Sequence, residues 1–399
     1  MELKNFKGKL VESFVGNMLM LVLNLILPMV LTRLYGVEIF GSYIYGITIV
    51  SMSLLLANLG MDMGLLYFIP KTGKKYITSC FVINVLTSAV TMLLLYMFMP
   101  KSLNPYIGLV WLLSAEQLFF SIYRARHHIR EFFLVKSIIG IGGLMLLSFI
   151  LYRLNGLNEI NIVISAYVAA IVSNIVYATQ TKDMFGEFEM HIEFISYSAT
   201  IILGGVMALL INYIDIVMIE AMMFKSDVAV YKVSAELAQI PSIFLTIVNT
   251  VFPPMISKLY HEGKVDEVRK LYEKLTRYLL VVSSIVIGLM MVFWNPILSL
   301  YGPEYLNGKM VLFYRGFGQL INASVGSVWY IVIMTGHPRI RFFAILTSAI
   351  INIVLNFLLI PIWGIDGAAF ASMASTVFIN ILGFFVVKKI IHSKVYFII

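Results

Sequence analysis

Charged residues are scarce in this chain of 399 residues: only 13% are Asp, Glu, Lys or Arg. Soluble globular proteins carry about 25% charged residues. Hydrophobic residues make up 60% of the chain, and its mean hydropathy is +0.92. These values exclude an ordinary soluble protein and indicate an integral membrane protein. The apolar runs are long and unbroken, which favours spanning α-helices over the short alternating strands of a β-barrel.

Cysteine and catalytic motifs are almost absent. The only cysteine is Cys80, so no internal disulfide is possible. There is no Walker A loop, no HExxH or GxSxG motif, and no His and Cys cluster with metal-ligand spacing. The basic N-terminus leads into an apolar run without a nearby small-residue cleavage site, which predicts no cleavable signal peptide. We expect no catalytic residue, no metal and no enzymatic activity.

The apolar runs predict an all-α polytopic membrane protein. A spanning helix needs about 20 apolar residues. About twelve such runs are present, and almost nothing is left for a soluble domain. The predicted spans are 11–33, 41–67, 77–99, 106–123, 134–152, 159–180, 194–221, 230–256, 276–299, 309–334, 342–362 and 366–390.

Basic residues predict the orientation of these spans. Most of the 29 Lys and Arg residues fall at both termini and in alternate connections, with Lys136 among them. The connections on the opposite side carry only Arg33, Lys101, Arg153, Lys225 and Lys309. Basic loops face the cytoplasm, so we expect both termini there. The net charge of +8 then reflects loops that face anionic headgroups rather than nucleic acid.

The two halves of the sequence are faintly similar. Tyr43 and Tyr231 occupy corresponding places in "LTRLYGVEIFGSYIYGITIVS" and "IEAMMFKSDVAVYKVSAELAQ". The stretch "LYRLNGLNEINIVISAY" near Gly156 resembles "LIPIWGIDGAAFASMAS" near Gly364. We therefore expect two six-helix lobes, residues 1–190 and 191–399, related by an axis along the membrane normal.

Two aspartates within predicted spans are candidates for function, because charge at membrane depth is costly. Asp215 lies well inside the seventh span, with Asn212 one turn earlier on the same face. Asp62 lies late in the second span. It is either a proton or cation site in a cavity or a carboxylate near the cytoplasmic lysines, and the sequence leaves both open.

Two glutamates near mid-span have a carboxamide neighbour. Glu116 precedes Gln117 in the fourth span, and Glu236 lies close to Gln239 in the eighth. Each fits either an ion site or an interhelical hydrogen bond between structural side chains.

Three basic residues in the outer half of the membrane suit an anionic cargo. They are Arg33 at the end of the first span, Lys232 near the start of the eighth and Arg315 a few residues into the tenth. Arg binds phosphate through a planar fork of donors, and Lys binds it as a point charge. Each of the three could instead extend its charge to the outer interface.

Two further stretches have structural interpretations. The break in "NFLLIPIWGIDGAAFAS" predicts a tight hairpin whose small residues let two helices pack closely, with Asp366 as an exposed turn residue. The stretch 261–278 has apolar residues at helical spacing, which predicts an amphipathic helix on the cytoplasmic surface before the ninth span.

Four motifs carry a resemblance to a known family. In chain order they are "LPMVLTRLYGVEIFGSYIYG", "LGMDMGLLYFIPKTGKK", "VFPPMISKLYHEGKVDEVRKLY" and "LNFLLIPIWGIDGAAFAS". Together they resemble the polysaccharide flippases of the multidrug/oligosaccharidyl-lipid/polysaccharide exporter superfamily. The resemblance covers essentially the whole chain.

This resemblance implies two lobes around a central cavity and alternating access. The cargo would be a polyprenyl-(pyro)phosphate-linked oligosaccharide, moved from the cytoplasmic to the outer leaflet of the cell membrane. Arg33, Lys232 and Arg315 would contact the anionic headgroup. Asp62, Asp215, Glu116 or Glu236 would carry a coupling ion, H⁺ or Na⁺, in a protein without other cofactors.

The resemblance also implies functional partners, and it leaves alternative functions open. We expect a monomer in contact with membrane lipids, functionally linked to glycosyltransferases and a polymerase, without nucleic acid. The nearest rival is a cation-coupled antiporter of drugs or organic cations from the same superfamily, whose cavity should be acidic and aromatic. A membrane-embedded glycosyltransferase or polymerase would need a longer outer loop or a metal-binding motif. A non-transporting scaffold also stays open.

Overall fold

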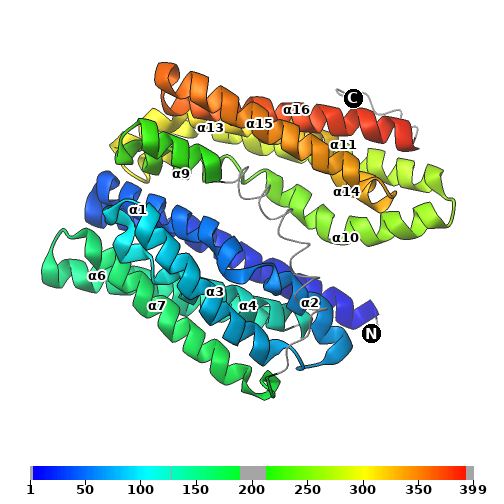
Figure 1. The fold of residues 1–399 in the computed structure, drawn as a ribbon. Helices are drawn as coiled ribbons and strands as arrows, with labels where there is room; N and C mark the ends of the chain where they lie inside the picture. The colour runs from blue at the N-terminus through cyan, green and yellow to red at the C-terminus, as the bar shows by residue number, and fades with distance from the viewer. Residues whose placement is uncertain (1–2, 127, 189–212, 392–399) are drawn as a thin grey trace. The chain divides into compact units, whose positions relative to one another are not determined.

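The computed structural model describes residues 3–126, 128–188 and 213–391, and no β-strand is present within these ranges. The chain divides into two compact units, Met1–Leu209 and Leu210–Ile399, called unit 1 and unit 2 below. The expected boundary between residues 190 and 191 lies outside the described residues. In Figure 1 the described part of each unit is a bundle of packed helices.

Unit 1 contains seven α-helices, two 3₁₀-helices and one π-helix in its described part. Its elements are α1 (Leu3–Asn58), α2 (Met61–Thr72), α3 (Ile77–Phe98), the 3₁₀-helix η1 (Lys101–Tyr106), α4 (Leu109–Ala125), α5 (Ile129–Val135), the π-helix η2 (Lys136–Gly142), α6 (Gly143–Asn155), α7 (Glu159–Gln180) and the 3₁₀-helix η3 (Lys182–Met184).

Unit 2 begins, in its described part, with helical residues 213–222. Its further elements are α9 (Lys225–Leu237), α10 (Ser242–His261), α11 (Val265–Val292), α12 (Trp294–Ser299), the 3₁₀-helix η4 (Pro303–Gly308), α13 (Lys309–Val325), α14 (Val328–Met334), α15 (Pro338–Trp363) and α16 (Ile365–Ile391).

Several helices are long and apolar enough to cross a membrane. In the described ranges there are seven, or nine if each of two bent helix pairs is one span. The helix Met18–Asn58 counts once although it overlaps the first two predicted spans. Most of the predicted span 194–221 lies outside the described residues. The chain is therefore a multi-span membrane protein, and the count of twelve spans stays a prediction.

Two breaks interrupt the N-terminal helical segment. At Gly36 the backbone is non-helical (φ 82°, ψ 164°), so a kink within α1, not a loop, separates the first two predicted spans. Leu59 and Gly60 have φ values of 45° and 75° and separate α1 from α2. The second predicted span is consequently divided between two helices.

Side chains of α3 support the end of α1 at this second break. Asn84 Nδ2 and Thr87 Oγ1 donate to the carbonyl oxygen of Ala57 at 3.1 and 2.5 Å. A helix end inside a membrane needs such partners, because lipid offers none to its backbone carbonyls. Asn84 also bonds Asn58 Oδ1 at 3.0 Å, which ties α1 and α3 together in the core of unit 1.

The amphipathic stretch before the ninth span does not lie free on a membrane surface. It forms the first turns of α11, which continues without a break to Val292. Val268 and Tyr272 are buried in the apolar core of unit 2, together with residues of α10, α14 and α16. Tyr272 Oη donates to the carbonyl oxygen of Val325 at 2.8 Å. The expectation of a surface helix is therefore wrong: its apolar stripe is covered by neighbouring helices rather than by lipid.

Corresponding elements recur in the two units. Gly156 (φ 69°, ψ −154°) ends α6, and Gly364 (φ 61°, ψ −138°) ends α15 in nearly the same backbone conformation. Each also donates its N–H to a carbonyl four residues back, at 2.9 and 2.8 Å. In both units a six-residue 3₁₀-helix precedes an α-helix of 17 residues, η1 before α4 and η4 before α13. These observations support the internal repeat.

Candidate functional site

A buried carboxylate, Asp215, is the centre of a polar cluster in unit 2. It lies on the helical residues 213–222 and is 4% exposed. Tyr231 Oη of α9 donates to its Oδ2 at 2.5 Å. Asn356 Nδ2 of α15 donates to Oδ1 at 2.8 Å, and Ser372 Oγ of α16 donates to Oδ2. Four helices thus supply one buried charge and its neutral hydrogen-bond donors.

Arg315 of α13 supplies the positive charge of this cluster. Its Nη1 lies 3.5 Å from Asp215 Oδ2, and the two side chains are 19% and 6% exposed. The Nε of Arg315 is buried without a hydrogen-bond partner among the described residues. Buried ion pairs are costly unless their remaining donors are satisfied. The guanidinium therefore has donor capacity left over while it neutralises the carboxylate.

A second residue on α15 extends the cluster. Asn352 lies one turn before Asn356, whose Nδ2 also donates to Asn352 Oδ1 at 3.1 Å. Asn352 Nδ2 donates to Ser372 Oγ at 3.3 Å. These contacts orient the two side chains of α15 and α16 that hold Asp215.

The stretch Asn356–Ser372 forms the predicted hairpin but does more than pack helices. Gly364 has the positive φ that the turn requires, and a Cβ at Gly367 would stand 2.4 Å from the carbonyl oxygen of Leu359. The first and last residues of the stretch both bond Asp215. The hairpin therefore also satisfies a buried carboxylate, because its two ends donate to the two oxygens of Asp215.

Asp366 also differs from the prediction. It lies in the first turn of α16 and is half-buried, not an exposed turn residue. Its Oδ1 is buried without a hydrogen-bond partner among the described residues. The turn is so tight that α16 begins at Ile365, directly after Gly364.

The other two basic candidates have different surroundings. Lys232 Nζ lies 3.0 Å from Glu236 Oε1, one turn later on α9, and the side chains are 28% and 33% exposed. Such a pair is common on partly exposed helix faces and contributes little to stability. Arg33 is an exposed residue of α1, three positions before the kink at Gly36.

Glu116 has a partner that the sequence did not indicate. Its Oε1 lies 2.5 Å from Lys136 Nζ. Lys136 was counted with a cytoplasmic connection at the edge of the predicted span 134–152, and it lies within the candidate span Ile129–Asn155. The neighbouring Gln117 instead accepts a hydrogen bond from Asn58 at 2.6 Å. Adjacent helical residues point in different directions, so the two serve different contacts.

Asp62 lies in the first turn of α2 and is half-buried. A carboxylate there is stabilised by the positive end of the helix dipole. An ion site and a carboxylate near the cytoplasmic lysines both stay predictions for Asp62. In the described ranges, no group of three or more His, Cys, Asp or Glu is arranged to hold a metal ion.

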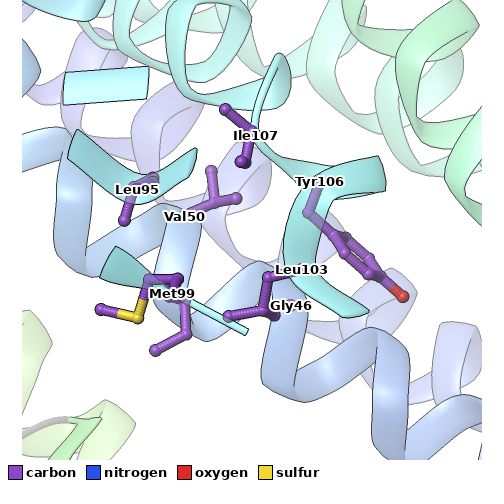
Figure 2. Close-up of a pocket in the computed structure, with 8 residues that line it drawn as sticks. Gly46, Val50, Leu95, Met99, Leu103, Tyr106 and Ile107 are labelled. Atoms are coloured by element: carbon purple, nitrogen blue, oxygen red, sulfur yellow. The ribbon is translucent and has the colours of Figure 1, made fainter. Parts of the chain in front are cut away.

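A small cavity in unit 1 is too apolar and too narrow to hold a charged headgroup. Its volume is about 10 Å³. Figure 2 shows the Tyr106 hydroxyl extending away from the other lining side chains, and it bonds Glu159 Oε1 at 3.1 Å. The cavity is lined by Gly46, Ile49, Val50, Leu95, Met99, Leu103, Tyr106 and Ile107.

Sequence reasoning missed Tyr231, Asn356, Ser372 and Lys136. One available signal was the pair Asn352 and Asn356, four residues apart in an apolar span. Two carboxamides on one helix face in lipid need partners on another helix. That spacing predicts a polar contact but not its identity.

Comparison with known proteins places the chain in a family. Residues 30–309 match the family described as polysaccharide biosynthesis protein. The capsular polysaccharide biosynthesis protein CapF of Staphylococcus aureus is 23% identical over 381 residues, covering 92% of this chain and 94% of that protein.

Solved structures share the fold. The lipid II flippase MurJ, in an inward closed conformation, is similar with a TM-score of 0.78 and 13% identity, covering 95% of this chain and 87% of that one. An inward-facing multidrug resistance MATE family transporter of the MOP superfamily has a TM-score of 0.74 and 11% identity, covering 93% and 94%. The family match covers most of the sequence, and the chain belongs to the polysaccharide biosynthesis protein family.

Proposed function

We propose that this protein is a flippase for surface polysaccharide biosynthesis. Its cargo is a polyprenyl-(pyro)phosphate-linked oligosaccharide, which it moves from the cytoplasmic to the outer leaflet by alternating access. The transport is coupled to a proton or sodium gradient. The protein works in the cell membrane as a monomer of about twelve spans in two lobes, with both termini in the cytoplasm.

The observation that supports this proposal most directly is the burial of the Arg315 guanidinium with one N–H donor unused in the described part of the chain. Its guanidinium is mostly buried in a membrane protein, contacts Asp215 through Nη1 at 3.5 Å, and leaves Nε without a partner among the described residues. Guanidinium groups bind phosphate through several parallel N–H donors. A cation with unused donors suits an anionic phosphate headgroup, and Arg315 is the residue that we assign to it.

Family membership supports the same class of cargo. The matched family is described as polysaccharide biosynthesis protein, and CapF is named for capsular polysaccharide biosynthesis. MurJ, which shares the fold, is named as a lipid II flippase. Glycosyltransferases that build the lipid-linked glycan and a polymerase that consumes it are the functional partners we infer.

Asp215 is the residue that we assign to ion coupling. Its carboxylate pairs with the Arg315 guanidinium, so a proton or Na⁺ that neutralised the carboxylate would free the guanidinium for the headgroup. Tyr231 and Ser372 donate to the same carboxylate oxygen and hold it in place. The other candidates for headgroup binding or ion coupling are less strongly supported, because their surroundings also fit structural or interfacial roles. They are Arg33, Lys232, Asp62, Glu116 and Glu236.

A drug or organic-cation antiporter is the second candidate, favoured by the shared fold with the MATE transporter. Such a protein needs carboxylates available to a cationic drug. In this chain Asp215, Glu116 and Glu236 each lie within 4 Å of a basic side chain. The basic side chains already neutralise these carboxylates, so they are not available to a cationic drug. This favours an anionic cargo over a cationic one.

Reconstituted vesicles test the two candidates directly. The purified protein is placed in liposomes that contain a fluorescent polyprenyl-pyrophosphate oligosaccharide, and arrival in the outer leaflet is read by an added glycosidase. We expect protein-dependent arrival, and no uptake of a fluorescent organic cation by the same vesicles. Cation uptake without glycolipid movement would refute the flippase proposal.

The same vesicles test ion coupling. An imposed proton or sodium gradient should accelerate glycolipid movement, and an ionophore specific for the active ion should abolish the acceleration. Equal rates with and without both gradients would refute coupling while leaving the flippase activity intact.

A further inference from the structure

A second, partly buried ion pair lies in unit 1, outside the cluster around Asp215. It joins α4 to the π-helix η2 through Glu116 Oε1 and Lys136 Nζ, 2.5 Å apart. The side chains are 11% and 24% exposed. Lys136 is the first residue of η2, so the pair sits where the helix leaves the α conformation.

The π-helix gives this span two possible registers. π-helices are rare and usually occur as short bulges inside α-helices, often at functional sites. Here η2 separates α5 from α6 within one candidate span of 27 residues. If η2 became α-helical, the two flanking helices would turn relative to each other by about 100°, which is one residue's share of a helical turn.

Gly140 makes room for Lys136 in the π register. A Cβ at position 140 would stand 3.2 Å from Lys136 Cδ and 3.8 Å from Ser173 Oγ. Gly143 lies in the same span, and nothing stands within 4 Å of its Cβ position. The lysine stem therefore crosses η2 at Gly140, while Gly143 is a matched position without that contact.

The present register leaves two buried hydroxyls unpaired. Ser137 and Ser173 are 1% and 0% exposed, and their Oγ atoms have no hydrogen-bond partner among the described residues. Buried hydroxyls without partners cost free energy. In the π register the Glu116–Lys136 ion pair is therefore formed while two buried hydroxyls stay without partners in the described part of the chain.

We propose that Lys136 is a positioning residue for transport that acts through Glu116. While the two are paired, η2 stays in the π register. When they separate, η2 becomes α-helical and the two ends of the span turn against each other. This inference rests on the proposed function, because the turn is one step of its alternating access.

Transport kinetics separate this role from a merely structural ion pair. The double variant E116Q/K136Q removes both charges and leaves none buried alone, so it should unfold at the wild-type temperature. We expect its maximal transport rate to fall at least about fivefold, the lower end of typical coupling energies, with an unchanged KM. K136R, which keeps the charge, should retain most of the rate. A double variant with the wild-type rate would overturn the proposal.

The two glycines provide a matched pair. Alanine favours the α-helix over glycine by about 1 kcal/mol at either position. Only Gly140→Ala also displaces the Lys136 stem, so it should lower the maximal rate more than Gly143→Ala does. Equal maximal transport rates for the two variants would contradict a role for the contact between the Lys136 side chain and Gly140.

The helical register of η2 can be measured in the absence of any cargo. This measurement tests the inference separately from the proposed function. Ile138 and Leu146 are 65% and 61% exposed. Nitroxide labels at these positions, on a Cys80→Ala background, report access to oxygen dissolved in lipid. The ratio of the two accessibilities should change between the wild-type pair and E116Q/K136Q. An unchanged ratio would overturn the inference, whereas a wild type that moves no glycolipid would overturn only the proposed function.

Discussion

Asn356 Nδ2 donates a hydrogen bond to Asp215 Oδ1 at 2.8 Å, across 141 residues of sequence. Ser372, at the other end of the α15–α16 hairpin, donates to the second oxygen of the same carboxylate. The hairpin therefore packs two helices and also satisfies a buried charge. Changes within it should affect stability and transport together.

Arg315→Ala should abolish most transport of the lipid-linked oligosaccharide. It removes the proposed headgroup contact and leaves Asp215 as an unpaired buried charge, which destabilises proteins by about 3–5 kcal/mol. The double variant R315A/D215N should regain stability without regaining transport. Arg339→Ala is the control, because Arg339 is exposed. Glycan export that persists in the single variant, measured by complementation of a flippase-deficient strain, would contradict the assignment.

Ser372→Ala should lower the free energy of unfolding by about 1–3 kcal/mol, the cost of a buried acceptor that loses a donor. Ser375→Ala is matched to it, since Ser375 is also buried but donates only to the carbonyl of Ser372 at 3.0 Å. Denaturant titration in detergent micelles measures both. Equal losses would mean that the bond to Asp215 contributes nothing beyond that of an ordinary helix serine.

Gly364→Ala should destabilise the protein more than Gly156→Ala. Both glycines have positive φ values with ψ near the extended region, and such a conformation costs other residues about 1–3 kcal/mol. A Cβ at 364 would additionally stand 2.9 Å from Met223 Cε, whereas the space around Gly156 is open. Thermal unfolding of the two variants gives the comparison. Adding Met223→Ala to Gly364→Ala should remove the difference.

Asn84→Ala should lower the free energy of unfolding by about 1–3 kcal/mol. Asn84 is 0% exposed and donates to the Ala57 carbonyl at the end of α1. Asn380→Ala is the control, because Asn380 is buried too but bonds Thr376 within its own helix. If both variants unfold alike, the break between α1 and α2 does not depend on this contact.

A tag at the C-terminus should be accessible to protease only from the cytoplasmic side. The physical reason is the excess of Lys and Arg in alternate connections, which cytoplasmic loops retain. Intact spheroplasts and inverted membrane vesicles give opposite digestion patterns in this assay. Digestion in intact spheroplasts would overturn the expected topology.

The sequence predicted some residues of the candidate site but not the contacts between them. Asp215 and Arg315 were both candidates, since charges inside apolar runs are visible in a linear sequence. Their pairing was not visible, because they lie on helices far apart along the chain. Glu116 and Gln117 were left open between an ion site and an interhelical hydrogen bond, and they contact Lys136 and Asn58 on different helices. Lys136 was counted with a cytoplasmic connection although it lies at the edge of the predicted span 134–152, and its contact with Glu116 was not visible in the sequence.

The sequence by itself determined that the chain is a helical membrane protein, where most helices lie and which charges lie within them. Hydropathy and helix-breaking residues are local properties, so a linear reading recovers them. Only the tertiary structure decided which side chains meet: Arg315, Tyr231, Asn356 and Ser372 around Asp215. Such meetings depend on the rotation of each helix about its axis and on kinks at single residues. Packing across the whole unit sets both.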